Sequence, residues 1–192
     1  MAPRALNATH TPDGKYAFEV DGLLGWGKYG SVHAARSVRF GDLVAVKVIP
    51  ASVLGAVATE LIAQAKMSHP HVVQLFNTQV DLDRRRVFMV MELCRGGELF
   101  DRLAESGKLD EATARRYLAQ LASGVAHCHG QNVFHRDLKV EEEGSSRGKN
   151  SLRGSYAHLF MPPSGTGRKH TSRRARQREN SRFWARHARP AC

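Results

Sequence analysis

Short runs rich in β-branched and aromatic residues follow one another from residue 16 to residue 92, and this pattern limits the possible folds most strongly. The expected strands are 16–24, 31–35, 43–49, 72–76 and 87–92, with turn residues such as Gly41-Asp42 between them. One segment differs: residues 53–67 are rich in Ala and Leu and stop before His69-Pro70, as a helix does ahead of a proline. The pattern predicts an antiparallel sheet with one helix packed on it.

The character of the chain becomes helical after Gly96-Gly97. A short helix is expected at 98–106 and a long one at 111–129, with Asp110 as its N-cap and Gly130 at its end. The long helix is amphipathic, because several apolar residues recur on one face at helical spacing. These residues are Tyr117, Leu118, Leu121, Ala122 and Val125.

Periodicity disappears beyond Lys139, where Ser, Gly, Arg and Lys dominate and aliphatic residues are few. Residues 141–192 hold 12 Lys+Arg against 4 Asp+Glu, so they carry most of the net charge of +11. We therefore expect residues 140–192 to be a basic disordered tail, and residues 1–15 to be a disordered N-terminus.

The 192 residues are enough for one domain with a tail. Three cysteines, Cys94, Cys128 and Cys192, form no Cys-x-x-Cys pair, which is typical of a reducing compartment. The sequence has no apolar run long enough to span a bilayer, and its first residues lack a signal-peptide core. We expect an intracellular protein, cytoplasmic or nuclear, without a membrane partner.

A glycine-rich string lies between the first two expected strands, and glycines at this spacing let a backbone approach phosphate groups closely. Its residues are Leu24, Gly25, Trp26, Gly27, Lys28, Tyr29, Gly30, Ser31 and Val32. A dinucleotide-binding fold would place a helix directly after such a loop. Here a strand follows, which favours a loop lying over the phosphates of a mononucleotide.

Two charged residues follow the glycine-rich loop in an order that supports its interpretation as a phosphate-binding loop. Val44-Ala45-Val46-Lys47 is a strand ending in a lysine able to neutralise phosphates, and Glu60 lies thirteen residues further in the expected helix. An ion pair between Glu60 and Lys47 would position the lysine. A strand-end lysine or a helical glutamate alone is ordinarily just solvated. The hypothesis of a phosphate-binding site therefore rests on the order of glycine loop, strand lysine and helix glutamate along the chain.

The last motif is His135-Arg136-Asp137-Leu138-Lys139. Asp137 could accept the proton of a substrate hydroxyl, and Lys139 could offset charge on a transferred phosphoryl group. Taken alone, an aspartate beside Arg and Lys is usually a surface ion-pair cluster. Four motifs in this order make chance a poor explanation.

Residues 16–139 resemble part of a eukaryotic serine/threonine protein kinase, of the calcium/calmodulin-dependent and AMP-activated branch. The run Gly96-Gly97-Glu98-Leu99-Phe100-Asp101 adds to this resemblance. It implies an α+β fold: an N-lobe at 16–92 with an antiparallel sheet and one helix, a hinge at 93–97, and an incomplete helical C-lobe at 98–139. The family transfers the γ-phosphate of ATP to a protein hydroxyl.

The resemblance also assigns roles around the nucleotide. Ala45 and Lys47 would line the ATP site, Met91 would be the gatekeeper beside adenine, and Glu92 and Cys94 would offer hinge hydrogen bonds. Glu98 would lie near the ribose and could receive a basic side chain of the substrate. A protein substrate with basic residues upstream of its acceptor is therefore expected.

The resemblance stops after Lys139, so we expect a domain truncated after the start of the catalytic loop. Glu142 stands where the family has an asparagine that binds Mg²⁺, and the Asp-Phe-Gly motif with the second ligand does not occur. The family's Mg²⁺ would lack its protein ligands, and the sequence predicts weak or no phosphotransfer. Gln64, four residues after Glu60, departs from the apolar residue of the family.

Other functions stay open. One is a non-catalytic nucleotide-binding or decoy module, and another is nucleic-acid binding or nuclear targeting by the basic tail. The second is less favoured because no nucleic-acid-binding fold accompanies the charge. His127, Cys128, His129 and His135 lack the paired spacing of zinc ligands, so no metal site is predicted.

Overall fold

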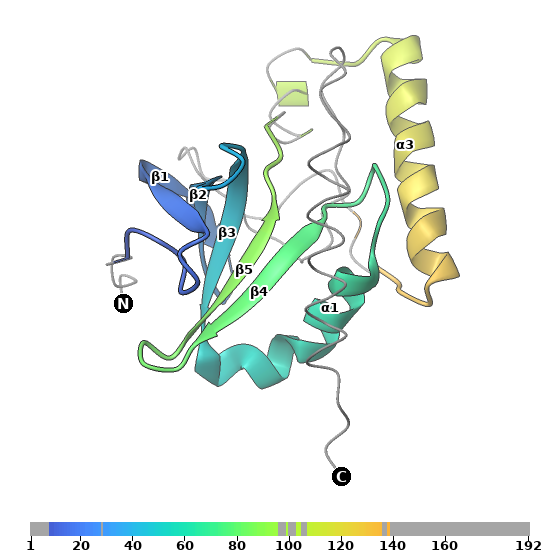
Figure 1. Ribbon diagram of the computed structural model, residues 1–192. Helices are drawn as coiled ribbons and strands as arrows, with labels where there is room; N and C mark the ends of the chain where they lie inside the picture. Colours follow the sequence, from blue (N-terminus) through green and yellow to red (C-terminus); the bar gives the residue numbers. More distant parts are fainter. Residues whose placement is uncertain are drawn as a thin grey trace.

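A five-stranded antiparallel sheet in the order β1-β2-β3-β5-β4 forms the centre of the computed structural model, which describes residues 8–27, 29–95, 99, 103–104, 107–135 and 138 (Figure 1). The strands are β1 (Tyr16–Gly27), β2 (Gly30–Ser37), β3 (Leu43–Pro50), β4 (Leu75–Asp81) and β5 (Arg86–Glu92). The helical elements are the 3-10 turn η1 (Ala51–Val53), α1 (Leu54–Lys66) and α3 (Glu111–Gly130). The predicted α+β lobe, with a sheet and one helix between its third and fourth strands, is confirmed.

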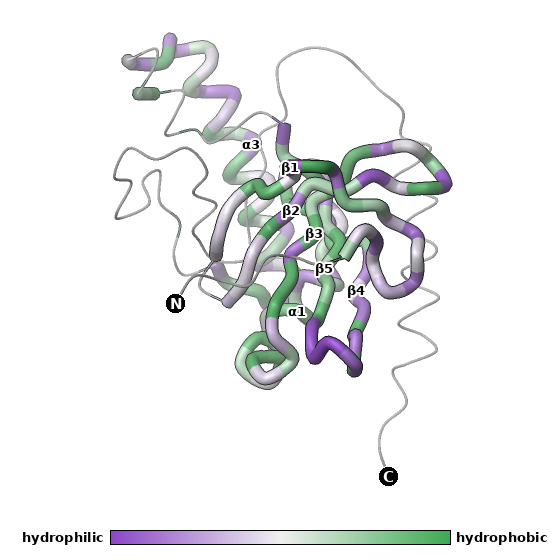
Figure 2. The backbone as a smooth tube through the Cα atoms, turned by 90° about the vertical axis from the view of Figure 1, so that its left-hand side faces the viewer, coloured by the Kyte–Doolittle hydropathy of each residue, from purple (hydrophilic) through white to green (hydrophobic). Residues whose placement is uncertain are grey.

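One strand prediction was partly wrong. Residues 72–76 were expected to be a strand, but β4 begins only at Leu75 and extends to Asp81. Val72 and Val73 are nevertheless buried. They are buried in a loop and not in a strand ladder, so their apolar character reflects packing of the loop. Figure 2 shows the hydrophilic turn between β4 and β5 that ends this hairpin.

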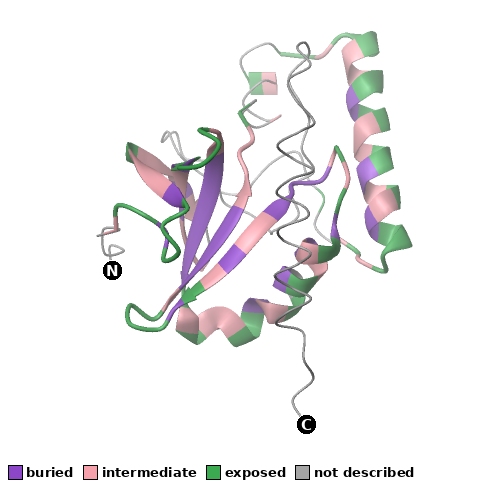
Figure 3. Ribbon diagram, in the orientation of Figure 1, coloured by how far each residue is buried: buried purple, intermediate pink, exposed green. Residues whose placement is uncertain are grey.

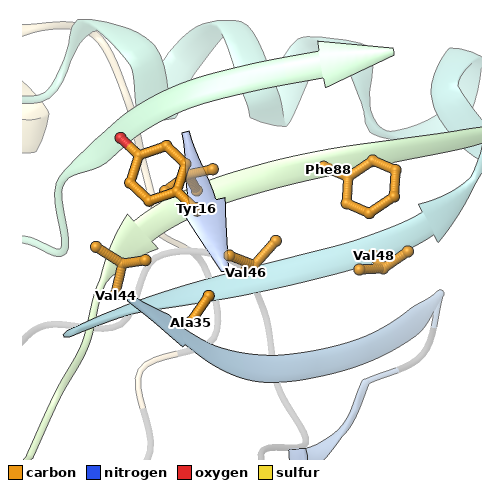
Figure 4. Close-up of a cluster of buried hydrophobic side chains, with 7 residues drawn as sticks. Tyr16, Ala35, Val44, Val46, Val48 and Phe88 are labelled. Carbon is orange, nitrogen blue, oxygen red and sulfur yellow. The ribbon is translucent and has the colours of Figure 1, made fainter. Parts of the chain in front are cut away.

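β3 is the central strand, and its residues alternate between two buried clusters, as the two-residue period of a strand requires. Val44, Val46 and Val48 belong to the outer cluster, together with residues of β1, β2 and β5. Figure 4 shows these side chains on the same side of the sheet. The full outer cluster is Tyr16, Ala35, Val44, Val46, Val48, Phe88 and Val90.

The opposite face of the sheet carries the inner cluster, which joins the sheet to α1. Val57 and Leu61 of the helix pack with Ile49 and Met89 of the strands. These helix positions are four residues apart and therefore lie on one side of α1. The inner cluster is Ile49, Val57, Leu61, Leu75, Val87 and Met89. As a result β3 is buried over nearly its whole length (Figure 3).

The N-terminal residues 8–15 form a turn that is bonded to the sheet, although the sequence predicted disorder up to residue 15. The Thr11 backbone N–H donates to the Tyr16 carbonyl oxygen at 2.9 Å, and the Thr11 hydroxyl donates to the Asp13 carboxylate at 2.9 Å. The Asp13 backbone N–H in turn donates to Gln79 Oε1 in β4 at 3.1 Å. Local Asp and Thr turn chemistry, together with long-range bonds to Val38, Asn77 and Gln79, accounts for this order.

Helix α3 begins as the sequence predicted. Asp110 Oδ1 accepts a hydrogen bond of 2.8 Å from the Thr113 backbone N–H, and hydrogen bonding by Thr113 holds the pKa of Asp110 below its ordinary value. The buried line of the helix agrees with the predicted stripe at Tyr117 and differs from it elsewhere. Its buried residues are Tyr117, Gly124 and Cys128, whereas Leu118 is 65% exposed.

α3 is joined to the sheet lobe by a small third cluster and a group of imidazole contacts. Cys128 packs with Met67 at the end of α1 and with Val72. The rings of His69 and His127 stack with their centroids 5.1 Å apart. Ser68 N–H donates to His127 Nε2 at 3.4 Å, and a hydrogen bond of 3.2 Å joins His69 Nε2 to the Ser123 hydroxyl. The loop before β4 is therefore the attachment point of α3.

The outer cluster should contribute a large part of the stability of the sheet. We expect Phe88→Ala to lower the free energy of unfolding by about 3–5 kcal/mol, because the change removes a fully buried ring and leaves a cavity. Leu82→Ala is the matched control: Leu82 is 80% exposed, and its loss should change stability by less than about 0.5 kcal/mol. Urea unfolding followed by circular dichroism would measure both, and equal effects would contradict the assigned core.

Candidate nucleotide site

The glycine-rich string forms the hairpin tip between β1 and β2. Trp26 pairs with Ser31 and Gly27 with Gly30. A Cβ atom on Gly30 would overlap the carbonyl oxygen of Val48 in β3, so only glycine permits this approach of backbone to backbone. The predicted loop is thus a tight hairpin beside the strand that carries Lys47, and Lys28 at its tip lies outside the described residues.

The strand registers bring four of the predicted nucleotide-binding residues onto one face of the sheet. Val32 lies opposite Lys47, and Ala45 lies opposite Met91. Directly opposed residues of antiparallel strands share a face, and Ala45 and Lys47 are two residues apart on β3. This face, which we call the inner face, is the one that packs on α1, because Met89 opposite Lys47 belongs to the inner cluster.

Lys47 is only 5% exposed, which is unusual for a lysine. Burial of an ammonium group in an apolar layer is costly unless charged or polar groups compensate it. Glu60, its predicted partner, lies on α1 one turn before Gln64, but the Glu60 side chain lies outside the described residues. The buried position of Lys47 on the inner face is what the structure adds to the sequence motif.

Two members of the glycine-rich string lie on the other side. Ser31 pairs with Val48 of the outer cluster, so Ser31 and its partner Trp26 occupy the outer face. The Ser31 hydroxyl is bonded to His33 Nε2 at 2.8 Å. Burial, and then the nearby charge of Arg86, lower the pKa of His33. The Ser31 side chain therefore points away from the inner face, so that its backbone alone could contact a nucleotide there. Leu24 and Gly25 lie in β1, before the hairpin tip.

The predicted hinge begins where β5 ends. The Glu92 backbone N–H donates to the Gln74 carbonyl oxygen at 2.9 Å, and Gln74 N–H donates to the Glu92 carboxylate at 3.4 Å. These bonds fix the end of β5. Burial, with a smaller contribution from Glu92, raises the pKa of the Cys94 thiol to about 12, so this cysteine stays protonated and unreactive near neutral pH.

The structure also reveals a contact that the sequence did not predict. Gln64 of α1 is buried, and its Nε2 lies 3.9 Å from Met91 Sδ. Its presence at a position where an apolar residue was expected could be noticed in the sequence, but its contact with Met91 could not. The remaining predicted site residues, Glu98, Asp137 and Lys139, lie outside the described residues.

Comparison with known proteins agrees with this geometry. A family profile described as "Protein kinase domain" matches residues 18–142. CBL-interacting protein kinase 19 of Oryza sativa subsp. japonica is 42% identical over 156 residues, covering 76% of this chain and 30% of that protein. CBL-interacting serine/threonine-protein kinase 18 of Arabidopsis thaliana is 41% identical over 134 residues, covering 67% of this chain and 25% of that protein.

The fold and the family match define a protein kinase domain. The relatives place it more narrowly: the chain belongs to the eukaryotic serine/threonine protein kinases. It spans about a quarter to a third of the length of the curated relatives it matches. Within the described residues, no helix is both long and apolar enough to cross a membrane.

The glycine geometry gives a direct test of the hairpin. We expect Gly30→Ala to destabilise the chain, because the added methyl group meets the Val48 backbone and the strands must separate. Gly55→Ala in α1 is the matched control, since nothing lies within 4 Å of its Cβ position. In the helix, alanine should stabilise by about 0.5–1 kcal/mol. Thermal unfolding of both variants would measure this, and a neutral Gly30→Ala would refute the close approach.

Proposed function

We propose that this chain binds ATP on the inner face of the sheet, in the manner of a serine/threonine protein kinase. The buried lysine carries the proposal: Lys47 shares its face with Ala45, Val32 and Met91, and the glycine hairpin lies at the end of the adjoining strand. Adenine would lie against Ala45 and Met91, with its edge bonded to the backbone of Glu92 and Cys94. The phosphates would extend towards Lys47 and the hairpin.

The residues present fit this nucleotide. Gly30 lets the hairpin backbone lie directly against the Val48 backbone of β3, the strand that carries Lys47, and this holds the hairpin tip near the lysine. An ammonium group held in a mostly apolar layer interacts with an anion more strongly than it would in water. Glu60, one helical turn before Gln64, would hold Lys47 in position when the phosphates are bound.

Replacement of the lysine tests the nucleotide site. We expect Lys47→Met to weaken ATP binding by about tenfold to a hundredfold, the range for loss of a charge-assisted hydrogen bond. Lys66→Met, at the exposed end of α1, should leave the affinity unchanged. Isothermal titration of the 192-residue chain with ATP measures both, and circular dichroism checks that Lys47→Met is folded. Equal affinities in the two variants would contradict the proposed site.

Phosphotransfer is a separate matter, because it depends on residues beyond the sheet. Mg²⁺ would neutralise the β- and γ-phosphates, but Glu142 replaces the family's asparagine and no Asp-Phe-Gly follows. The residues present therefore do not supply the usual ligand set for the metal. We propose that the 192-residue chain binds ATP but transfers its γ-phosphate poorly, with Asp137 and Lys139 as the remaining catalytic residues.

Radiolabelled ATP with Mg²⁺ and a generic basic protein substrate tests this part. We expect incorporation far below the rate of about 1–100 per second that is typical of kinases, and the same background in Asp137→Asn. ATP-dependent thermal stabilisation without turnover would support the non-catalytic reading. Efficient phosphorylation that disappears in Asp137→Asn would overturn the proposal of poor transfer and establish Asp137 as the base.

The substrate class follows from family resemblance. Glu98 supports a protein substrate with Arg or Lys upstream of its acceptor hydroxyl, and an intracellular location, cytoplasmic or nuclear, fits such a substrate. Nucleic-acid binding by the basic residues 140–192 is the second candidate function. Their charge would give salt-dependent affinity for phosphates without sequence preference.

A further inference from the structure

Two Asp-Gly dipeptides occur in the chain, Asp13-Gly14 and Asp21-Gly22. This dipeptide undergoes a particular main-chain reaction, because glycine has no side chain to shield its backbone nitrogen from the aspartate carboxyl group. The nitrogen attacks Cγ, a C–N bond forms and water leaves, which gives a cyclic succinimide. Water then opens the ring at either carbonyl, and the product is aspartate or its β-linked isomer, isoaspartate. In a folded protein the reaction depends on how firmly the dipeptide is held.

Asp13-Gly14 is held at both reacting groups. The Asp13 carboxylate accepts hydrogen bonds from the Thr11 hydroxyl at 2.9 Å and from the Lys15 backbone N–H at 3.1 Å. The Gly14 nitrogen, which would be the nucleophile, donates its proton to the Thr11 carbonyl oxygen at 2.8 Å. Formation of a succinimide at this position would first have to break the N-terminal turn.

Asp21-Gly22 lies in an irregular part of β1. Phe18 pairs with Ala35 and Leu23 pairs with His33, so residues 19–22 bulge out of the ladder between these two pairs. Asp21 is exposed and has a φ of 54°. No described residue donates a hydrogen bond to its carboxylate or forms an ion pair with it. The two dipeptides therefore have the same chemistry in opposite environments.

The bulge also explains why glycine follows Asp21. A Cβ atom on Gly22 would lie 2.7 Å from the Glu19 carbonyl oxygen and 3.0 Å from that of Ala34. Both distances are shorter than an ordinary van der Waals contact, so any other residue would force the bulge to open. The packing of the bulge thus places next to Asp21 the residue type whose nitrogen is least shielded.

We propose that Asp21-Gly22 is a site of spontaneous isomerisation, at which the folded chain forms isoaspartate while Asp13-Gly14 stays intact. The product has an additional methylene group in the main chain of the bulge, between the two paired parts of β1. It also carries a free α-carboxylate beside the main chain. The site would therefore take a methyltransferase that uses S-adenosylmethionine and recognises this carboxylate. The inference does not depend on the proposed binding of ATP.

Tryptic peptides separate the two sites, because cleavage after Lys15 and Lys28 places Asp13 in peptide 5–15 and Asp21 in peptide 16–28. The folded 192-residue chain is incubated at neutral pH, digested, and labelled with protein-L-isoaspartate methyltransferase and radioactive S-adenosylmethionine. We expect peptide 16–28 to gain label at least about tenfold faster than peptide 5–15. Reaction at Asp13 must first break hydrogen bonds to a charged group, each worth about a factor of ten. A sample that is not incubated gives the background.

Three controls accompany this measurement. In guanidinium chloride both dipeptides are released, and the ratio of the two rates should fall towards one. Asp21→Glu should remove the label from peptide 16–28, because a glutamate side chain would have to form a larger ring. Asp83→Glu, at another exposed aspartate that is followed by Arg84, should leave both rates unchanged.

The outcomes separate an effect of the fold from an effect of the dipeptide. Faster labelling of peptide 16–28 in the folded chain only, lost in Asp21→Glu and kept in Asp83→Glu, supports the proposal. Labelling of the two peptides at equal rates in the folded chain would overturn it. So would an unchanged ratio in guanidinium chloride, or label in peptide 16–28 that survives Asp21→Glu.

Discussion

The double burial of β3 is the constraint on which the rest of the structure depends. Val44, Val46 and Val48 pack in the outer cluster, whereas Ile49 packs in the inner one. A shift of one residue in register would exchange the two faces and move Lys47 into the outer cluster. The packing that stabilises the sheet therefore also fixes the side on which the lysine lies. The position of Lys47 on the inner face is specified by the alternation of valines around it.

β5 transmits this constraint to the hinge. It pairs with β3 so that Met91 lies opposite Ala45, and its end is held by the main-chain bond between Glu92 and Gln74. Gln74 comes from the segment that looked like a strand but is a buried loop. That loop has a double role, since its other residues contact α3. The place where adenine is proposed to bind thus depends on backbone bonds that most side-chain substitutions would not disturb.

Most of the sheet could be predicted from sequence, because strands buried on both faces leave a strong apolar pattern and the turns between them carry Gly and Asp. The N-cap at Asp110 could also be predicted from the sequence, since capping is a local interaction. Predictions that depend on distant partners were less successful. On α3 the apolar stripe predicted the burial of Tyr117, but it did not reveal that of Gly124 and Cys128, which depends on what the helix packs against.

The same distinction applies to the site. Order along the chain pointed to Lys47 and the glycine hairpin, and the registers bring Val32, Ala45 and Met91 onto the face of Lys47. Ser31 and His33 are two residues apart on β2 and therefore share a face, but the sequence did not show that this is the outer face, because the pairing of Ser31 with Val48 of β3 decides it. The contact between Gln64 and Met91 was also not predictable, since a sequence shows that residue 64 is polar but not which side chain it meets.

Nucleotide binding and phosphotransfer have different physical foundations in this chain. The proposed binding residues lie on strands stabilised by two large clusters, so they belong to the most cooperative part of the molecule. Asp137 follows α3, which is attached through the small cluster around Cys128 and a few bonds among histidines and serines. An attachment of this size can open without unfolding the sheet. The proposed binding of ATP on the sheet would therefore not depend on residues that follow α3, and a loss of phosphotransfer would leave the proposed nucleotide site unchanged.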